Sequence, residues 1–293
     1  MIIISGHSNI ALAQQIAGLI SAPLVIAECQ KFAADEMRIH INAELKGRNV
    51  AIVQSISRPT HDHLLELLLL LDTAAKMQAQ TITAVIPYLC YARQDRPTHN
   101  EPAAAHLIIK LIEATGVNKV VTLELHSQRV ASLFSVPAVN IDSTTLFAPY
   151  FTDINDITVI APDFGGIARA KRLANALQAP VTLLDKDRHR TPPMEMVFGN
   201  THGRHCIICD DIIDTGFTMQ QAAQVLRNNG ATAVSACATH TVLSPGCAMR
   251  MQNSGIEGVY VTNSIAPIKL YNNVHIVSAA GLIARALQTN TTG

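Results

Sequence analysis

Residues Cys206 to Thr218 read CIICDDIIDTGFT, and this stretch decides the fold and points to the chemistry. Its apolar start, Cys206–Cys209, is typical of a buried strand, and a helical pattern follows from Met219 to Asn228. Between the strand and the helix stand three aspartates and three smaller residues: Asp210, Asp211, Asp214, Thr215, Gly216 and Thr218. The stretch therefore predicts a strand, an acidic turn and a helix N-terminus.

This order of elements suits a phosphorylated sugar. The first N–H groups of a helix and the positive end of its dipole favour a phosphate, and nearby carboxylates accept hydrogen bonds from sugar hydroxyls. The alternative is a capped helix with Thr218 or Asp214 as N-cap. Capping explains one oxygen-bearing side chain but not three acids within five residues, because close carboxylates repel one another. We therefore favour a ribose phosphate site.

Composition bounds the remaining possibilities. The chain has 293 residues, of which 48% are hydrophobic and 15% charged, as in a packed enzyme of about two domains. Acidic and basic residues balance at 22 each, so bulk charge predicts neither nucleic-acid nor membrane binding. The apolar stretch Leu64–Leu71 contains Glu66 and is too short to cross a bilayer, which predicts a buried helix. The first residues carry no signal-peptide pattern, and we expect a cytoplasmic protein.

The cysteines and histidines offer few metal sites by spacing alone. Most of the six cysteines stand in apolar runs, as expected of reduced, packed thiols. Cys206 and Cys209 form a C-x-x-C, but in a strand their side chains point to opposite faces, and no second pair completes a zinc site. His61 and His63 are expected on an exposed helix face.

Strand-like and helical segments alternate along the chain, which predicts parallel sheets covered by helices, with ligands at the carboxyl ends of the strands. The candidate strands are Ile2–Ile4, Val50–Gln54, Thr83–Ile86, Lys119–Leu123, Thr158–Ala161, Val181–Leu184, His205–Cys209, Ala233–Ala238 and Gly258–Val261. The candidate helices are Ile10–Leu19, His61–Met77, Ala103–Thr115, Gly166–Leu177, Met219–Asn228 and Gly281–Gln288. The strand–helix–strand segment from residue 49 to 86 parallels that from 205 to 238, which indicates an internal duplication.

The opening stretch resembles the 5-phosphoribosyl 1-diphosphate (PRPP) binding loop of type I phosphoribosyltransferases. Four further segments extend the resemblance over nearly the whole chain and narrow it to the ribose-phosphate pyrophosphokinases: Phe32–Glu36, PYLCYARQDR at Pro87–Arg96, LELHS at Leu123–Ser127 and APDFGGIARA at Ala161–Ala170. The resemblance implies an α/β fold of two phosphoribosyltransferase-like domains, each a mostly parallel sheet flanked by helices, with the site between them. We expect these domains at residues 1–145 and 146–280, with the helix at 281–293 packing back on the first.

The resemblance also implies the reaction, in which a diphosphoryl group passes from ATP to the C1 hydroxyl of ribose 5-phosphate and AMP leaves. Asp210 and Asp211 would face the ribose hydroxyls, and the segment Asp214–Thr218, including Thr215 and Gly216, would wrap the 5-phosphate. Phe217 departs from the family, which usually has a second glycine there, and a phenylalanine would be strained if the backbone required positive φ.

Lys186 and Arg188 match the family's pair of basic residues that bind the transferring phosphates. They follow an apolar strand and precede Pro192 and Pro193, which predicts a loop. Asp187 replaces a residue that is usually basic. A solvated charged loop is the alternative.

The metal is expected to be Mg²⁺, held near His126 and Asp163. Each follows an apolar strand and so lies at a strand's carboxyl end. The carboxylate of Asp163 is the harder donor that Mg²⁺ prefers, and the resemblance adds His126. The alternatives are a structural histidine and a plain strand-to-helix turn.

For ATP the resemblance implies Arg93, Gln94 and Asp95 around the phosphates, with Phe32 and Glu36 at the adenine. In the family the last two come from a neighbouring subunit, which implies a homo-oligomer. Ala34 and Asp35 depart from the usual F-x-D-G-E, since Ala34 replaces the aspartate and Asp35 the glycine. Phe32 as a simple core residue is the alternative.

Three functions stay open at this point. The first is an active PRPP synthetase, and the second is a salvage phosphoribosyltransferase, which would share only the PRPP loop. The third is a weakly active homologue that regulates such an enzyme, which Ala34, Asp187 and Phe217 keep open. The presence of Lys186, Arg188, His126 and Asp163 favours the active enzyme. The short segment Pro97–Pro102 resembles family members without the phosphate/ADP allosteric site, so we expect little ADP allostery.

Overall fold

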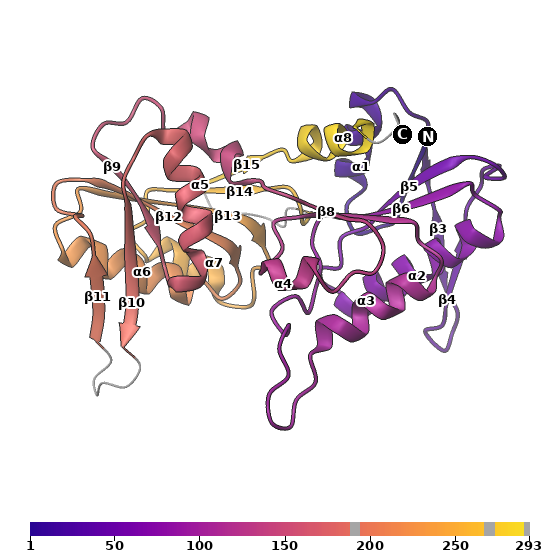
Figure 1. The fold of residues 1–293 in the computed structure, drawn as a ribbon, viewed down its shortest axis with the longest axis horizontal. Helices are drawn as coiled ribbons and strands as arrows, with labels where there is room; N and C mark the ends of the chain where they lie inside the picture. The colour runs from indigo at the N-terminus through magenta and orange to yellow at the C-terminus, as the bar shows by residue number, and fades with distance from the viewer. Residues whose placement is uncertain (188–193, 267–272, 290–293) are drawn as a thin grey trace. The chain divides into compact units, whose positions relative to one another are not determined.

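The computed structural model describes residues 1–187, 194–266 and 273–289 (Figure 1). The chain divides into two compact units. Unit 1 comprises Met1–Ile141, Ser264–Ala266 and Ser278–Gly293, and unit 2 comprises Asp142–Asn263 and Pro267–Val277.

Unit 1 is built on a six-stranded parallel sheet in the order β2-β1-β5-β6-β7-β8. Its elements are β1 (Ile2–Ser5), α1 (Ile10–Leu19), β2 (Leu24–Ile26), β3 (Glu28–Lys31), β4 (Met37–His40), β5 (Asn49–Val53), α2 (Thr60–Lys76), β6 (Thr81–Ile86), α3 (Ala104–Ala114), β7 (Lys119–Leu123), α4 (Gln128–Ala131), β8 (Ala138–Ile141) and α8 (Ala280–Gln288). Leu71 of α2 and Ile109 of α3 share a core with Ile52 of β5, so these two helices cover one face of the sheet. Helix α8 packs against α1 and β8, although it is the last element of the chain.

Unit 2 is built on a seven-stranded sheet in the order β11-β10-β9-β12-β13-β14-β15, in which only the edge strand β11 is antiparallel. Its elements are η1 (Thr144–Tyr150), β9 (Ile157–Ala161), η2 (Phe164–Gly166), α5 (Ile167–Leu177), β10 (Val181–Asp187), β11 (Met194–Phe198), β12 (His205–Ile213), α6 (Phe217–Asn228), β13 (Ala233–Thr241), α7 (Cys247–Gln252), β14 (Gly258–Thr262) and β15 (Val274–Val277).

Both faces of the sheet in unit 2 are covered. Cys206 packs in a core with α6 and α7, whereas Cys209 packs in a second core with η1 and α5. The two thiols therefore point to opposite faces of β12, as predicted. Because helices cover both faces, β12 begins as a continuous apolar run rather than an alternating one.

The strand orders of the units agree with the predicted duplication. The order β2-β1-β5-β6-β7-β8 in unit 1 repeats as β10-β9-β12-β13-β14-β15 in unit 2, and unit 2 adds β11 at its edge. The predicted α/β class with mostly parallel sheets flanked by helices is confirmed.

Several local expectations need correction. The hairpin of β3 and β4 and the edge strand β11 were not expected. Strand β3 is mostly polar, whereas β4 alternates apolar and polar residues and its pattern was overlooked. His61 is exposed and lies 2.9 Å from the Tyr91 hydroxyl, but His63 is half-buried with its Nδ1 2.9 Å from the Ser57 carbonyl oxygen, so the exposed-face prediction was wrong for His63. Leu67, Leu70 and Leu71 are buried in α2 as predicted, whereas Leu65 in the same stretch is 46% exposed. Within the described residues, we find no helix with the length and apolarity that a bilayer crossing requires.

Candidate functional site

The two neighbouring acids of the opening stretch lie inside a strand. Strand β12 continues its pairing with β13 as far as Ile213, opposite Thr241, so Asp210 and Asp211 are not in a turn as predicted. The turn is displaced because the parallel ladder continues past the apolar run. Asp211 is buried and Asp210 is mostly buried, with side-chain exposures of 6% and 19%. Burial of two adjacent carboxylates requires a compensating cation.

Arg169 supplies that cation. It extends from α5, is itself buried, and places Nη1 3.2 Å from Asp210 Oδ1 and Nη2 3.5 Å from Asp211 Oδ1. Burial first, and the neighbouring Asp211 second, raise the pKa of Asp210 well above its usual range, while Arg169 acts in the opposite direction. The sequence interpretation missed Arg169. A signal was available, because Arg169 stands four residues before Leu173 on the apolar face of its helix.

The turn that follows β12 is opened by glycine. Gly216 is the N-cap of α6 with φ 76°, and neither Thr218 nor Asp214 caps the helix, so the capping alternative was wrong. Phe217 is the first helical residue and is 53% exposed, so the positive φ falls on Gly216 and the expected strain at Phe217 is absent. Thr215 and Thr218 are also exposed. The helix N-terminus therefore presents the hydroxyl-bearing side chains of Thr215 and Thr218, and the Phe217 N–H donates to Thr215 Oγ1 at 3.3 Å.

Neighbouring residues hold this turn in place. The Ser244 hydroxyl donates a hydrogen bond to the Asp214 carboxylate, and the Arg250 guanidinium donates to the Thr215 carbonyl oxygen at 3.0 Å. A Cβ at residue 216 would lie 3.1 Å from Cys247 Sγ and 3.2 Å from Met251 Cγ. Sterics and backbone conformation both demand glycine there.

Asp163 lies at the carboxyl end of β9, the strand next to β12 in the sheet. Its side chain is exposed, and its Oδ1 accepts a hydrogen bond from the Gly166 N–H at 2.9 Å. The structure therefore brings Asp163 to the same edge of the sheet as Asp210 and Asp211.

Lys186 lies near the end of β10, which is paired with the antiparallel strand β11. Lys186 pairs with Glu195, so the prediction of a loop was wrong for residues 185–187, because the two strands form a hairpin that extends past the ladder with β9. Arg188 lies outside the described residues.

In unit 1 two predicted segments meet where β6 and β7 end. The Ser127 hydroxyl donates to Asp95 Oδ2 at 2.7 Å, and Arg129 Nε donates to the Asp95 carbonyl oxygen at 3.1 Å. Asp95 is thereby held beside the LELHS segment, in which His126 is exposed. Arg93 and Gln94 are also exposed, so this edge presents basic and polar groups to solvent.

Phe32 and Glu36 lie in the turn of the β3–β4 hairpin. The Phe32 N–H donates to the Glu36 carbonyl oxygen at 2.8 Å, and Phe32 is 53% exposed, so its alternative placement in the core was wrong. Asp35 takes φ 61°, a conformation that glycine adopts without cost. The departure from the family's glycine thus falls at a left-handed position, which aspartate tolerates better than most residues.

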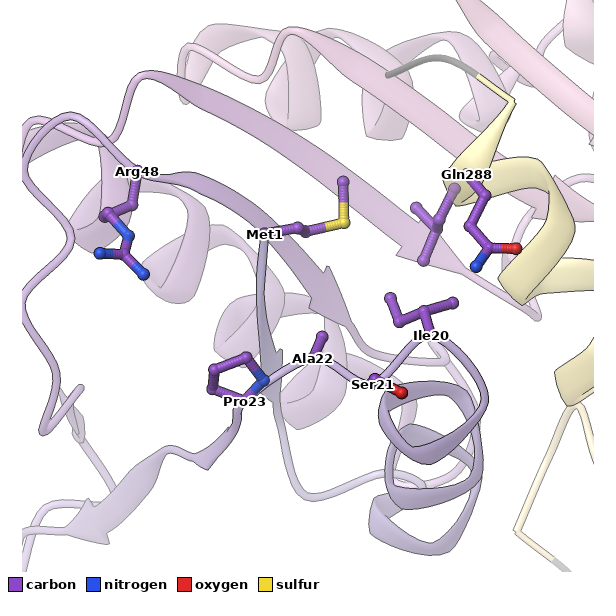
Figure 2. Close-up of a pocket in the computed structure, with 8 residues that line it drawn as sticks. Met1, Ile20, Ser21, Ala22, Pro23, Arg48 and Gln288 are labelled. Carbon is purple, nitrogen blue, oxygen red and sulfur yellow. The ribbon is translucent and has the colours of Figure 1, made fainter. Parts of the chain in front are cut away.

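A pocket of about 310 Å³ lies elsewhere in unit 1 (Figure 2). Its lining includes Met1 and Arg48, which precede β1 and β5, together with Ile20 and Gln288. It therefore opens at the amino ends of the parallel strands, away from the edge at which the predicted residues lie.

Comparisons with known proteins agree with this geometry. The family profile described as the N-terminal domain of ribose phosphate pyrophosphokinase matches residues 1–116, and the phosphoribosyl transferase domain profile matches residues 129–253. The fold, the residues at the carboxyl ends of its strands and the two profiles thus define an enzyme with phosphoribosyltransferase-type domains.

Relatives over the full chain narrow this class. The chain is 39% identical to a ribose-phosphate pyrophosphokinase of Bacillus cereus, covering 97% of this chain and 92% of the relative. It is 37% identical to that of Rhizobium meliloti, covering 98% and 96%. A crystal structure of phosphoribosylpyrophosphate synthetase from Mycobacterium smegmatis superposes with a TM-score of 0.92 at 29% identity, covering 98% and 97%. The chain belongs to the ribose-phosphate pyrophosphokinase family, and the resemblance seen in the sequence is confirmed.

Proposed function

We propose that this enzyme transfers the β,γ-diphosphoryl group of ATP to the C1 hydroxyl of ribose 5-phosphate, giving PRPP and AMP. The C1 oxygen attacks the β-phosphorus, and the bond from that phosphorus to the oxygen bridging to the α-phosphate breaks. Such transfers depend mostly on positioning and on cations near the phosphoryl oxygens. The observation that carries the proposal is the buried Asp210–Asp211–Arg169 group, followed directly by the helix start at Gly216, in a chain of this family.

The carboxyl edge of β12 is the proposed ribose 5-phosphate site. Asp210 and Asp211 would accept hydrogen bonds from the ribose hydroxyls, with Arg169 fixing both carboxylates. The turn Asp214–Thr218 would bind the 5-phosphate through the N–H groups at the start of α6 and the exposed hydroxyls of Thr215 and Thr218. The hydrogen bond from Ser244 to Asp214 supports this role by fixing the turn before ligand arrives.

The proposed ATP site uses Arg93, Gln94 and Asp95, with Phe32 and Glu36 at the adenine. The exposure of Phe32 on a hairpin supports binding across subunits in a homo-oligomer, because an apolar ring at such a position gains by covering a ligand or partner. Lys186 and Arg188 would bind the transferring phosphates. We propose that the enzyme acts in the cytoplasm.

The proposed metal is Mg²⁺, which would neutralise charge on the phosphates when bound. The family generally requires a divalent metal. Asp163 fits this role because it is exposed and offers a carboxylate oxygen beyond the one that accepts from Gly166. His126 lies at the corresponding edge of unit 1 and would contact the metal or its phosphate ligands.

One of the three sequence departures that kept a regulatory homologue open, Phe217, has a local explanation. Positive φ falls on Gly216 rather than Phe217. The structure offers no observation that favours a salvage phosphoribosyltransferase over the proposed reaction.

The test is an assay of the purified chain with ATP, ribose 5-phosphate and Mg²⁺, with AMP and PRPP measured together. We expect Asp211→Asn to lower kcat/KM by about 100-fold or more, since the lost interactions position the reacting sugar. The matched control is Asp153→Asn, at an exposed aspartate of the same unit, with activity within about twofold. Absence of AMP with the unaltered chain would overturn the proposal and favour the regulator.

A further inference from the structure

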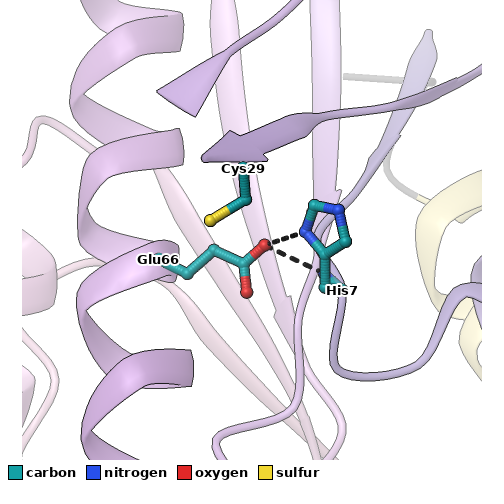
Figure 3. A group of neighbouring side chains, drawn as sticks. All are labelled: His7, Cys29 and Glu66. Carbon is teal, nitrogen blue, oxygen red and sulfur yellow. Dashed lines mark hydrogen bonds and ion pairs between the residues drawn. The ribbon is translucent and has the colours of Figure 1, made fainter. Parts of the chain in front are cut away.

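Three side chains with different donor atoms meet in unit 1, and none of them was assigned a role above. His7 follows β1, Cys29 lies in β3, and Glu66 lies in α2. Figure 3 shows the Cys29 sulfur and the His7 ring directed toward the Glu66 carboxylate. Their ligand atoms all lie within 4.8 Å of one another, and this is the one such group of histidine, cysteine and acidic residues among the described residues.

The carboxylate is fixed before any ligand arrives. Glu66 is buried, its Oε2 accepts from Gln54 Nε2 at 2.6 Å, and its Oε1 lies 2.5 Å from His7 Nδ1. Gln54 is itself held by the Ser8 N–H at 3.1 Å. A Cβ at residue 6 would lie 2.3 Å from Gln54 Oε1, so Gly6 leaves the room that this amide needs. Such outer partners orient metal ligands in known sites.

We propose that His7, Cys29 and Glu66 bind a borderline divalent metal ion of the Zn²⁺ type, with solvent at the fourth position. A nitrogen, a sulfur and an oxygen donor form a set that Zn²⁺ accepts and Mg²⁺ does not favour. The ion would take the place of the hydrogen bond between the His7 ring and Glu66. The two ligand atoms would then move apart, since tetrahedral ligands stand about 3.3 Å from each other at Zn–N and Zn–O distances of about 2.0 Å.

The charges balance in the bound form. The Cys29 S–H loses its proton to solvent as the metal–sulfur bond forms, so thiolate and carboxylate together neutralise the ion. The nearby Lys31 ammonium is offset by Asp62, at 2.6 Å. The His7 side chain is 41% exposed, which leaves the group open to an entering ion.

The ion would join the base of the β3–β4 hairpin to α2 and to the segment after β1. This hairpin carries Phe32 and Glu36, so its fixation would change ATP affinity. That consequence rests on the proposed function, whereas binding of the ion does not.

The test uses the full chain stripped of metal, without nucleotide, titrated with Co²⁺ and Zn²⁺. We expect one ion per chain and a thiolate-to-Co²⁺ charge-transfer absorption. All six cysteines lie in the described residues, and Cys29 is half-buried while the other five are buried, so the absorption can be assigned to Cys29. Cys29→Ser should remove the absorption and weaken Zn²⁺ binding by at least about 100-fold. Gln54→Met should weaken it by about 10- to 100-fold.

Controls separate this site from the proposed catalytic edge. His61→Gln, at an exposed histidine of the same helix, should leave Zn²⁺ affinity unchanged, and His7→Gln should reproduce the loss. Lack of a thiolate absorption, binding by Cys29→Ser within about threefold of the unaltered chain, or loss of the ion in His126→Gln would each overturn the proposal. PRPP synthesis is measured separately with Mg²⁺, so its failure would not affect the metal result.

Discussion

In unit 2 the strand β12 carries the acids and helix α5 carries the cation, whereas in unit 1 the strand β5 is followed by the neutral Gln54 and helix α2 carries the acid. Both edges occupy the same place in the repeated strand order. Arg169 holds Asp210 and Asp211 in one, while Gln54 and His7 hold Glu66 in the other. The two units therefore share a strand order but differ in the side chains that gather at the carboxyl ends of β12 and β5.

The largest expected effect comes from removing the buried cation of unit 2. Arg169→Leu leaves two close carboxylates uncompensated and should lower the free energy of unfolding by about 3–5 kcal/mol. Glu66→Gln in unit 1 loses the hydrogen bond from Gln54 Nε2 or that from the His7 N–H, because its NH2 group cannot accept, and should cost about 1–3 kcal/mol. Thermal and urea denaturation of the full chain measures both.

A matched control for Arg169 stands on the same helix. Arg172 pairs with Asp142 at 3.1 Å with both side chains about one-third exposed, at 34% and 37%, so Arg172→Leu should cost about 1 kcal/mol or less. Equal losses for Arg169→Leu and Arg172→Leu would contradict the role given to burial.

The next effect concerns the turn before α6. Gly216→Ala forces a Cβ against Cys247 and Met251 at φ 76° and should cost about 1–3 kcal/mol, with a raised KM for ribose 5-phosphate. Gly203→Ala is the control, because Gly203 has φ 73° in open space and carries only the backbone cost. A KM that rises equally in both variants would show that the turn plays no part in binding.

A smaller effect tests the residue that departs from the family. Phe217 starts α6 with no positive φ, so Phe217→Gly should destabilise the chain by up to about 1 kcal/mol. The KM for ribose 5-phosphate should stay within about twofold, measured in the PRPP assay. A clear fall in KM would mean that Phe217 does obstruct phosphate.

The smallest effect lies in the hairpin of unit 1. Asp35→Gly restores the family residue at φ 61° and should stabilise the chain by about 0.5–1 kcal/mol, measured by thermal denaturation. Asp35→Ala, which has no side-chain oxygen to bond the turn, should destabilise it. Stabilisation by alanine would show that the left-handed conformation is not the cause.

Apolar periodicity predicted the parallel sheets because buried strands and amphipathic helices leave strong patterns. It placed β5, β7 and β9 within a residue or so of their observed bounds. It placed the end of β12 four residues early, at Cys209 rather than Ile213, since polar residues inside a strand break the pattern. Strands β3, β4 and β11 were missed, although β4 alternates apolar and polar residues.

The candidate site of unit 2 was predicted less completely than the fold, for a physical reason. Asp210, Asp211 and Gly216 could be named because their types are unusual beside an apolar run. Arg169 could not be paired with them, because its partners lie about forty residues away and only the tertiary fold brings them together. The group formed by His7, Cys29 and Glu66 has no local spacing at all and depends on three separate elements.

Helix α8 has a consequence for biogenesis. It belongs to unit 1, with Ile283 and Leu287 buried and Ser278 bonded to Gln15 at 2.7 Å, yet it leaves the ribosome after all of unit 2. Unit 1 therefore cannot complete its packing until unit 2 has been translated, and the surface of α1 that α8 covers stays exposed until then. Truncating the carboxyl-terminal helix would thus destabilise unit 1, which contains the amino-terminal half of the chain.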